Sequence, residues 1–234
     1  MGVAILFEII ILALAPHLAK AEFNQMMPLI SSKKQEQIRK YHSHIDSQNS
    51  LLGDILIRAE ICRITGLCNK QLEFSTNEYG KPCLINDRGI HFNITHTNNF
   101  VACAIGDEPV GIDIEQIKPI TLKIAERFFA EDETLYIISR EDGLIYHRFF
   151  EIWTKKESYI KWIGKGLSIP LSSFSVFDVA KEGEANFRQV FNDDRFVCHT
   201  CSINMEFPRV KKMSTTDFFE YLNAIGMLEK HLLS

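Results

Sequence analysis

Helical and extended segments follow each other in two successive groups along this chain, and that order limits the fold more than any other feature. Three short β-branched or apolar runs, residues 91–95, 100–105 and 110–115, are separated by turn residues and predict strands. Apolar residues at helical spacing precede these runs, at residues 51–65, and follow them, at residues 146–163. This order predicts an α+β protein of two similar-sized halves that meet near Gly111.

The remaining segments complete the two groups. A buried first strand is expected over residues 7–14, helices over residues 19–30, 31–41 and 122–129, and further strands near residues 174–179, 189–191 and 196–203. Residues 75–83 predict turns, and the last helix is expected over residues 216–233, opened by Ser214, Thr215 or Thr216. We expect an N-terminal subdomain at residues 1–110 and a C-terminal subdomain at residues 111–234.

Composition restricts the classes of partner. Of the 234 residues, 46% are hydrophobic, which predicts a soluble globular protein with a packed core. With 26 Lys and Arg against 30 Asp and Glu, the chain has none of the basic excess of a nucleic-acid binder. Any anionic ligand therefore needs a local group of cations. The densest group is Lys33, Lys34, Arg39 and Lys40, which is a candidate for binding a terminal phosphate and otherwise a solvated helix face.

The first fifteen residues are apolar, but their pattern does not fit a targeting or membrane-spanning segment. No Lys or Arg precedes the run, Glu8 interrupts it, and it falls short of the ~20 residues that span a bilayer. The six cysteines are spread too widely for a disulfide scaffold, and a reducing cytoplasm is expected. Cys198 and Cys201 form a C-x-x-C pattern, yet they lie in a run that predicts a strand.

Two carboxylates share one face of the strand predicted over residues 110–115. Side chains alternate along a strand, so Asp113 and Glu115 in VGIDIE point to one side while Ile112 and Ile114 point to the other. Oxygen ligands at this spacing suit a hard cation such as Mg2+. Taken alone, the pair fits a solvated edge strand better than a metal site.

The helix predicted over residues 146–163 supplies matching groups. Trp153, Glu157 and Lys161 follow each other at intervals of four and therefore lie along one stripe of the helix. If that stripe faces the strand, Glu157 adds a third oxygen ligand and Lys161 meets a phosphate that also touches the metal. The alternative is an ordinary glutamate–lysine surface pair.

His96 follows a strand and precedes a turn. Backbone N–H groups of Thr95 and His96 at such a position can point at a ligand, although a single histidine is more often structural.

Three of these segments, FNITHT, VGIDIE and WTKKESYIKWIGKGLS, resemble the signature blocks of Sfp-type phosphopantetheinyl transferases. The segments RKYHSHIDSQNSLLGDILIRAEICR, FSTNEYGKPCL, KPITLKIAERFF and LSIPLSSFSV resemble the same family in the same order. Each block alone is a modest signal. Together they extend over roughly residues 7–180.

The resemblance implies two α+β subdomains related by a pseudo-twofold axis, with coenzyme A and the metal in the cleft between them. By position in the motifs it implies the following roles: Asp113, Glu115 and Glu157 as metal ligands, Asp113 beside the coenzyme, Lys161 on the pyrophosphate, Thr95 and His96 on phosphate, Lys34 and Lys81 on the coenzyme, and Glu133 as a general base. Gln37 and Ser50 depart from the family pattern near the 3′-phosphate.

The activity that the resemblance implies is transfer of the phosphopantetheine arm of coenzyme A to a serine of an apo carrier protein, with release of 3′,5′-ADP. The enzyme would be a holo-[acyl-carrier-protein] synthase type transferase that uses Mg2+, or alternatively Mn2+, and Glu157, Glu133 and Lys161 would act in catalysis. Its partners would be peptidyl, polyketide or acyl carriers, as in antibiotic biosynthesis. We expect a cytoplasmic monomer that binds neither nucleic acid nor membrane. The alternatives are a metal-dependent phosphohydrolase and an inactive relative that binds coenzyme A or a carrier.

Overall fold

A computed structural model describes residues 7–14, 18–85, 89–139, 143–204 and 206–228. The helices are α1 (Lys20–Met26), α2 (Ser32–Ile38), α3 (His44–Thr65), α4 (Lys123–Phe128), α5 (Glu131–Ile138), α6 (Ile145–Ile163), α7 (Val176–Glu182) and α8 (Thr215–Ala224). The strands are β1 (Glu8–Ala13), β2 (Phe74–Thr76), β3 (Pro82–Leu84), β4 (His91–Thr97), β5 (Phe100–Gly106), β6 (Val110–Gln116), β7 (Asn186–Asn192), β8 (Phe196–Ser202) and β9 (Arg209–Ser214). None of the helices in these residues is long and apolar enough to cross a membrane.

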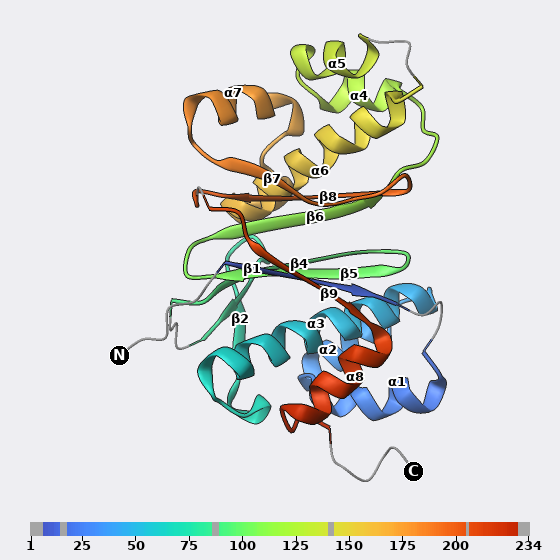
Figure 1. Cartoon of the computed structure of the whole chain (residues 1–234), viewed down its shortest axis with the longest axis vertical. Helices are drawn as coiled ribbons and strands as arrows, with labels where there is room; N and C mark the ends of the chain where they lie inside the picture. The colour runs from blue at the N-terminus through green and yellow to red at the C-terminus, as the bar shows by residue number, and fades with distance from the viewer. Residues whose placement is uncertain (1–6, 15–17, 86–88, 140–142, 205, 229–234) are drawn as a thin grey trace.

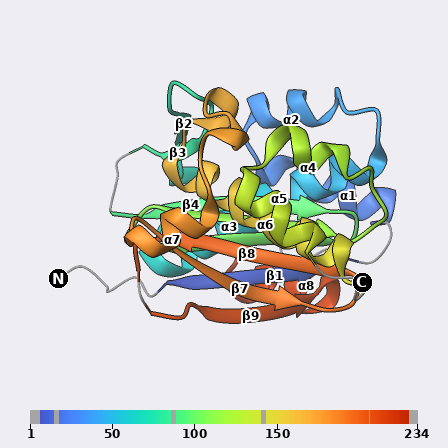
Figure 2. The ribbon, with the colours of Figure 1, turned by 90° about the horizontal axis from the view of Figure 1, so that it is seen from above.

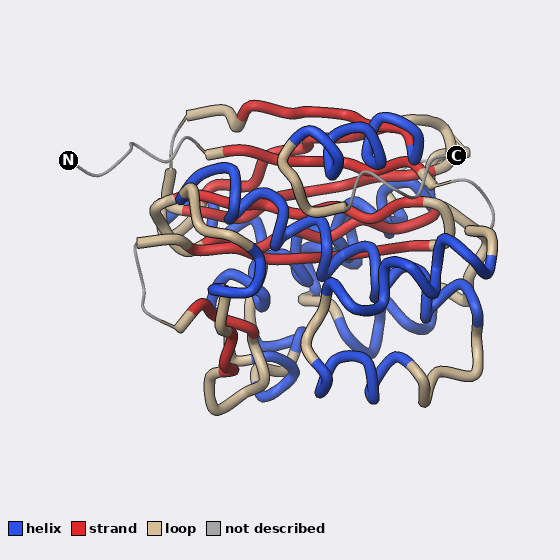
Figure 3. Tube along the Cα trace, turned by 90° about the horizontal axis from the view of Figure 1, so that it is seen from below, coloured by secondary structure: helices blue, strands red, loops and turns tan. Residues whose placement is uncertain are grey.

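Two sheets lie face to face between two layers of helices (Figure 1). The first sheet has the strand order β4-β5-β1-β9 and the second β6-β8-β7, while β2 and β3 form a separate hairpin. Figure 3 shows the strands of both sheets running broadly along one direction, as in aligned sheet packing, with the hairpin apart from them.

Alternation along β1 explains how the first sheet is buried on both faces. Ile9 and Ile11 pack against Ile112 and Ile114 of β6 between the sheets. Ile10 and Leu12 point the other way, into the core under α3. Apart from Glu8 at its start, the run EIIILA is apolar on both faces and forms an interior strand, which confirms the buried strand predicted over residues 7–14.

Each sheet carries one long helix on its outer face. Helix α3 begins at His44, seven residues before the predicted start, and Ser43 caps it by accepting from the N–H of Asp46. Its apolar side chains cover β1, β4 and β5. Helix α6 covers the second sheet, where Ile152 packs with Val197 of β8.

The end of the described chain returns to the first sheet. Strand β9 pairs parallel to β1, and Phe218 and Leu222 of α8 are buried in the core below α3. The division between residues 110 and 111 stays a prediction. The segment from Arg209 onward belongs to the predicted C-terminal subdomain, yet it lies with the first sheet. The reason is the open edge of β1, which β9 covers.

Several sequence expectations are confirmed. The strands at residues 91–95, 100–105, 110–115 and 196–203 and the helices at residues 122–129 and 146–163 are present with small shifts of their ends. Ser31 caps α2 as expected, and Ser214 caps α8 together with Asp217. Helix α8 ends at Ala224, so the predicted helix is wrong over residues 225–228, where Gly226 adopts a positive φ; residues 229–233 of its predicted range lie outside the described residues.

The strand predicted near residues 174–179 is wrong, because these residues form the start of α7. The Ser175 side chain accepts from the N–H of Phe177, and a carboxylate oxygen of Glu133 accepts from the N–H of Val176 at 2.8 Å. These two side chains satisfy the first free N–H groups of a helix, so its β-branched residues fold as helix. Helix α5 and strand β9 were not predicted, and the turn-rich segment at residues 75–83 includes the β2–β3 hairpin.

Cys198 and Cys201 lie in β8 as the pattern predicted. Three residues apart on a strand, they point to opposite faces, Cys198 between the sheets and Cys201 toward α6 and α7. This pair therefore cannot converge on one metal ion.

Candidate active site

The site forms where the edge strands of the two sheets meet. Asn93 and Thr95 of β4 reach across to β6, where Asn93 Oδ1 accepts from the N–H of Ile112 at 3.0 Å and Thr95 Oγ1 accepts from the N–H of Ile114 at 3.4 Å. These side chains replace the backbone ladder that an adjoining strand would supply. The bonds hold β6, with its two carboxylates, against β4.

Asp113 is the centre of the charged cluster. Thr95 Oγ1 donates to Asp113 Oδ1 at 3.1 Å, and the Lys161 ammonium lies 2.6 Å from the same oxygen. Lys161 also donates to the carbonyl of Ile112 at 3.1 Å and to Thr95 Oγ1 at 3.3 Å. The structure thus brings a lysine of α6 onto a carboxylate of β6 and a hydroxyl of β4, so the stripe of α6 that carries Lys161 faces β6. The phosphate contact expected of Lys161 stays a prediction.

Negative charge accumulates around Asp113. Burial and then the charge of Asp113 raise the pKa of Glu115 to about 7. The same two causes, in the same order, raise the pKa of Glu157. The three carboxylates therefore act on one another, as expected from β6 and α6 facing each other.

The donor set suits a hard divalent cation. All three groups offer oxygen, and Asp113 Oδ2 is buried without a hydrogen-bond partner among the described residues. A cation would also offset the repulsion that raises the pKa of Glu115 and Glu157. In the described part of the chain, however, no three His, Cys, Asp or Glu side chains are drawn together as a metal-binding group. Lys161 is the cation that contacts Asp113 in this arrangement.

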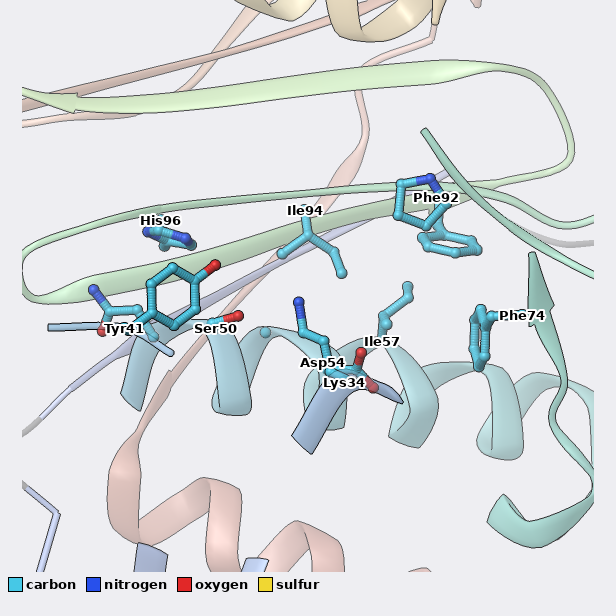
Figure 4. Close-up of a pocket in the computed structure, with 12 residues that line it drawn as sticks. Lys34, Tyr41, Ser50, Asp54, Ile57, Phe74, Phe92, Ile94 and His96 are labelled. Atoms are coloured by element: carbon cyan, nitrogen blue, oxygen red, sulfur yellow. The ribbon is translucent and has the colours of Figure 1, made fainter. Parts of the chain in front are cut away.

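A cavity of about 240 Å³ lies between α2, α3 and β4, on the face of β4 opposite to Asn93 and Thr95 (Figure 4). Lys34, Ser50 and His96 line it together with Asn49 and with apolar residues of β4 and the hairpin. Burial and then the charge of Lys161 lower the pKa of His96. The cavity thus combines Lys34 and His96, two of the predicted coenzyme contacts, and His96 is within range of the charge of Lys161.

Lys81, another predicted coenzyme contact from the first half, does not line this cavity. Its ammonium donates to the carbonyls of Val110, Lys161 and Trp162. Burial lowers the pKa of Lys81 to about 8.

Glu133 lies apart from the carboxylate cluster, in a closed set of bonds. It is fully buried and pairs with the Lys156 ammonium at 2.7 Å. Its oxygens also accept from the N–H groups of Ala130 and Val176, both at 2.8 Å. This arrangement joins elements and does not favour the general-base role, which stays a prediction.

Sequence reasoning missed Asn93 and the burial of Lys156. Asn93 stands two residues before Thr95 in HFNITHT, so a polar alternation within an otherwise apolar strand was available as a signal. Lys156 stands at helical spacing with Phe149, Ile152 and Ile160, which predicts a place on an apolar helix face, but nothing in the local pattern identifies Glu133 as its partner.

Comparison with known proteins identifies relatives along most of the chain. Residues 109–209 match the profile of the 4′-phosphopantetheinyl transferase superfamily, and residues 17–107 match that of the 4′-phosphopantetheinyl transferase N-terminal region. The chain is 43% identical over 159 residues to 4′-phosphopantetheinyl transferase Sfp of Bacillus subtilis (strain 168), covering 68% of this chain and 71% of the relative. It is 39% identical over 200 residues to 4′-phosphopantetheinyl transferase gsp of Aneurinibacillus migulanus, with 83% and 84% covered. It is 35% identical over 215 residues to 4′-phosphopantetheinyl transferase psf-1 of Bacillus pumilus, with 91% and 92% covered.

Proposed function

Because the chain belongs to the 4′-phosphopantetheinyl transferase superfamily, we propose that it transfers the phosphopantetheine arm of coenzyme A to a serine of an apo carrier protein. The observation that carries this proposal is the Lys161 ammonium at the junction of β4 and β6, beside three carboxylates. The cavity lined by Lys34 and His96 lies on the other face of β4. A cation and a set of oxygen donors at one junction suit a pyrophosphate ester.

In the proposed reaction the serine Oγ attacks the β-phosphorus of coenzyme A. A bond forms between that oxygen and phosphorus, the bond from phosphorus to the bridging oxygen breaks, and 3′,5′-ADP leaves with the bonding electrons. The serine proton must pass to a base, and the leaving group must carry its added negative charge.

Asp113, Glu115 and Glu157 would hold a divalent cation such as Mg2+, or Mn2+ in its place, and the unpartnered Asp113 Oδ2 is the most evident donor. Bound there, the cation would neutralise the pyrophosphate and so stabilise the leaving group.

Lys161 would bind the pyrophosphate. Its ammonium has a short contact with Asp113 and longer ones with Thr95 Oγ1 and the Ile112 carbonyl, so a small rotation exchanges a carbonyl bond for a charge-assisted bond to phosphate. Thr95 and His96 lie on the same strand and would contact phosphate from the first half.

Glu157 is the better-supported base for the serine proton. Its carboxylate lies within range of the charges of Asp113 and Lys161, and therefore near the proposed position of the pyrophosphate. Glu133 is occupied by Lys156 and two backbone N–H groups, which favours Glu157 over Glu133 in this role.

The cavity would receive the nucleoside end of coenzyme A, with Lys34 and His96 as phosphate contacts. We propose peptidyl, polyketide or acyl carriers as partners and a monomer in the cytoplasm. The described cysteines are free thiols, which supports a reducing compartment.

The test is mass spectrometry of apo carrier proteins incubated with the protein, coenzyme A and Mg2+. We expect the mass of one phosphopantetheine arm to be added to at least one carrier. Glu157→Gln should lower the rate by at least about 100-fold without changing the unfolding temperature. Glu220→Gln, an exposed change of the same kind on α8, should have no effect.

Two results would contradict the proposal. If no carrier in a panel of peptidyl, polyketide and acyl carriers gains mass, the transfer proposal fails. Release of free phosphopantetheine without a carrier would instead identify a phosphohydrolase.

A further inference from the structure

The turn of the β2–β3 hairpin lies on the C-terminal end of α6, so a segment of the first half touches the helix that carries Glu157 and Lys161. Figure 2 shows the hairpin on the side of the molecule where the chain leaves α6. Two side chains of this turn, Asn77 and Lys81, make the contacts. We call these two residues the clasp.

Asn77 has its amide oriented by the turn itself. Its Oδ1 accepts from the N–H groups of Tyr79 at 3.0 Å and Lys81 at 2.9 Å. Its Nδ2 is thereby directed outward and donates to the carbonyl of Gly164 at 2.7 Å. Gly164 is the left-handed residue that ends α6, so Asn77 binds the helix where its carbonyls lack partners within the helix.

Lys81 completes the contact with three bonds to backbone carbonyls. Its ammonium donates to Lys161 at 2.5 Å, to Val110 at 3.2 Å and to Trp162 at 3.4 Å. A lysine ammonium has three N–H groups, and all three are accounted for here. The charge also stands at the negative end of the α6 dipole, where it is favourable.

The fit at the helix end leaves little free space. A Cβ added at Gly164 would lie 3.0 Å from Lys81 Cδ and 3.3 Å from Asn77 Nδ2. Both members of the clasp therefore pack against the last turn of α6, in addition to binding its carbonyls.

The clasp joins the two elements that carry the charged site. Lys81 holds the carbonyl of Val110, which begins β6 three residues before Asp113, and the carbonyl of Lys161, whose ammonium contacts Asp113. The start of β6 and the end of α6 are thus fixed to one ammonium. A shift of α6 along β6 would have to break these bonds.

We propose that Lys81 and Asn77 are positioning residues, which hold α6 against β6 so that Lys161 and Glu157 stay in register with Asp113. This inference rests on the proposed transferase function and assigns Lys81 a role other than binding the coenzyme. Lys81 acts through the backbone of Lys161, and coenzyme A keeps its contacts with Lys34 and His96 in the cavity.

The experiment separates turnover from coenzyme binding. For Lys81→Met, which keeps the aliphatic stem and removes the ammonium, we expect kcat to fall about tenfold or more, because small misplacements of reacting groups have effects of this size. The Kd for coenzyme A, measured by calorimetry without a carrier, should change less than about twofold. Asn77→Ala should also lower kcat with the Kd unchanged, although Asn77 carries no charge for a phosphate.

Hydrogen–deuterium exchange gives a readout that does not depend on turnover. Amides at residues 158–166 should exchange faster in both variants than in the wild type, while those of α3 should not change. Lys70→Met, which removes a charge from an exposed lysine outside the clasp, is the matched control and should leave kcat, Kd and exchange unchanged.

The proposal is overturned if Lys81→Met raises the Kd for coenzyme A about tenfold at unchanged kcat while Asn77→Ala behaves as wild type. Lys81 would then be a coenzyme ligand. If Lys81→Met does not fold, Asn77→Ala decides, and wild-type exchange at residues 158–166 in that variant also overturns the proposal. A wild-type protein that modifies no carrier would defeat the transferase proposal, whereas the clasp would still be judged by exchange.

Discussion

Gly111 marks a close approach between the backbones of β6 and α6. A Cβ at this position would overlap the carbonyl oxygen of Ser158 and lie 2.5 Å from the backbone nitrogen of Trp162. The backbones of β6 and α6 are therefore in contact here. That contact brings Asp113 and Glu115 within range of Glu157 and Lys161.

We predict that Gly111→Ala lowers the free energy of unfolding by about 1–3 kcal/mol or more, because the helix must move away from the strand. Its transferase activity should fall as well, since the displaced helix carries Lys161. Gly106→Ala is the control, because its Cβ would meet nothing closer than 3.7 Å. Thermal unfolding followed by circular dichroism measures the stability of both variants. An unchanged Tm for Gly111→Ala would contradict this packing of α6 on β6.

His199 of β8 is a buried titratable residue. It pairs with Asp113 of β6 in the second sheet, so both side chains point to the same face of that sheet. Thr154 Oγ1 donates its single proton to the carbonyl of Phe150 at 2.7 Å and therefore accepts from His199 Nδ1 at 2.8 Å. Burial, with smaller effects from Lys155 and His147, lowers the pKa of His199 well below 6.5.

The pH dependence of stability follows from that shift. Below pH 6.5 the unfolded chain binds a proton at His199 that the native state does not bind, so stability falls as pH decreases. As the pH decreases from 6.5 to 5, we predict that the free energy of unfolding falls less steeply for His199→Gln than for the wild type. The two slopes should differ by up to about 1.4 kcal/mol per pH unit. Urea unfolding across this range measures the difference. If the free energy of unfolding depends on pH in the same way for the wild type and the variant, His199 titrates normally. His42→Gln, at an exposed position, is the control.

At the scale of elements, a buried ion pair connects α5, α6 and α7. Glu133 of α5 binds the Lys156 ammonium of α6 and caps α7 through the N–H of Val176. Lys156 also donates to the carbonyls of Leu171 at 2.7 Å and Phe174 at 2.6 Å. These bonds leave neither charge unpaired and fix three helices over the second sheet.

We predict that Glu133→Gln or Lys156→Met alone lowers the free energy of unfolding by about 3–5 kcal/mol, because each leaves its partner charge buried without a counterion. The double replacement should cost less than the sum of the two. Denaturant unfolding of the three variants tests this coupling. If Glu133→Gln instead keeps full stability and loses turnover, Glu133 is the general base.

At the scale of the whole molecule, the first half is completed by the end of the chain. Strand β9 covers the edge of β1, and Met213, Phe218 and Leu222 are buried in the core below α3. The first half therefore depends on residues that follow the entire second half in sequence.

We predict that a chain ending at residue 208 loses cooperative unfolding, because the edge of β1 and the core under α3 are exposed to water. A synthetic peptide of residues 206–234 should restore cooperative unfolding when added to this truncated chain. Circular dichroism and size-exclusion chromatography measure both states. A truncated chain that unfolds cooperatively at the wild-type Tm would show that the return is dispensable.

The sequence by itself determined the features that depend on near neighbours. Alternation placed Asp113 and Glu115 on one face of a strand, helical spacing placed Glu157 and Lys161 on one stripe, and the order of motifs indicated the family. The buried first strand and the three strands after residue 90 were predicted for the same reason, because a run of apolar or alternating residues carries its own signal.

Only the tertiary structure decided which polar residues are bound inside and to what. Lys81 binds a carbonyl 80 residues away, and Lys161 binds a carboxylate 48 residues away. In sequence, nothing revealed the buried partners of Lys81 and Glu133, because a charged residue shows no pattern that identifies a distant partner. The same limit applied to β9 and α7, whose conformations depend on the open edge of β1 and on the carboxylate of Glu133.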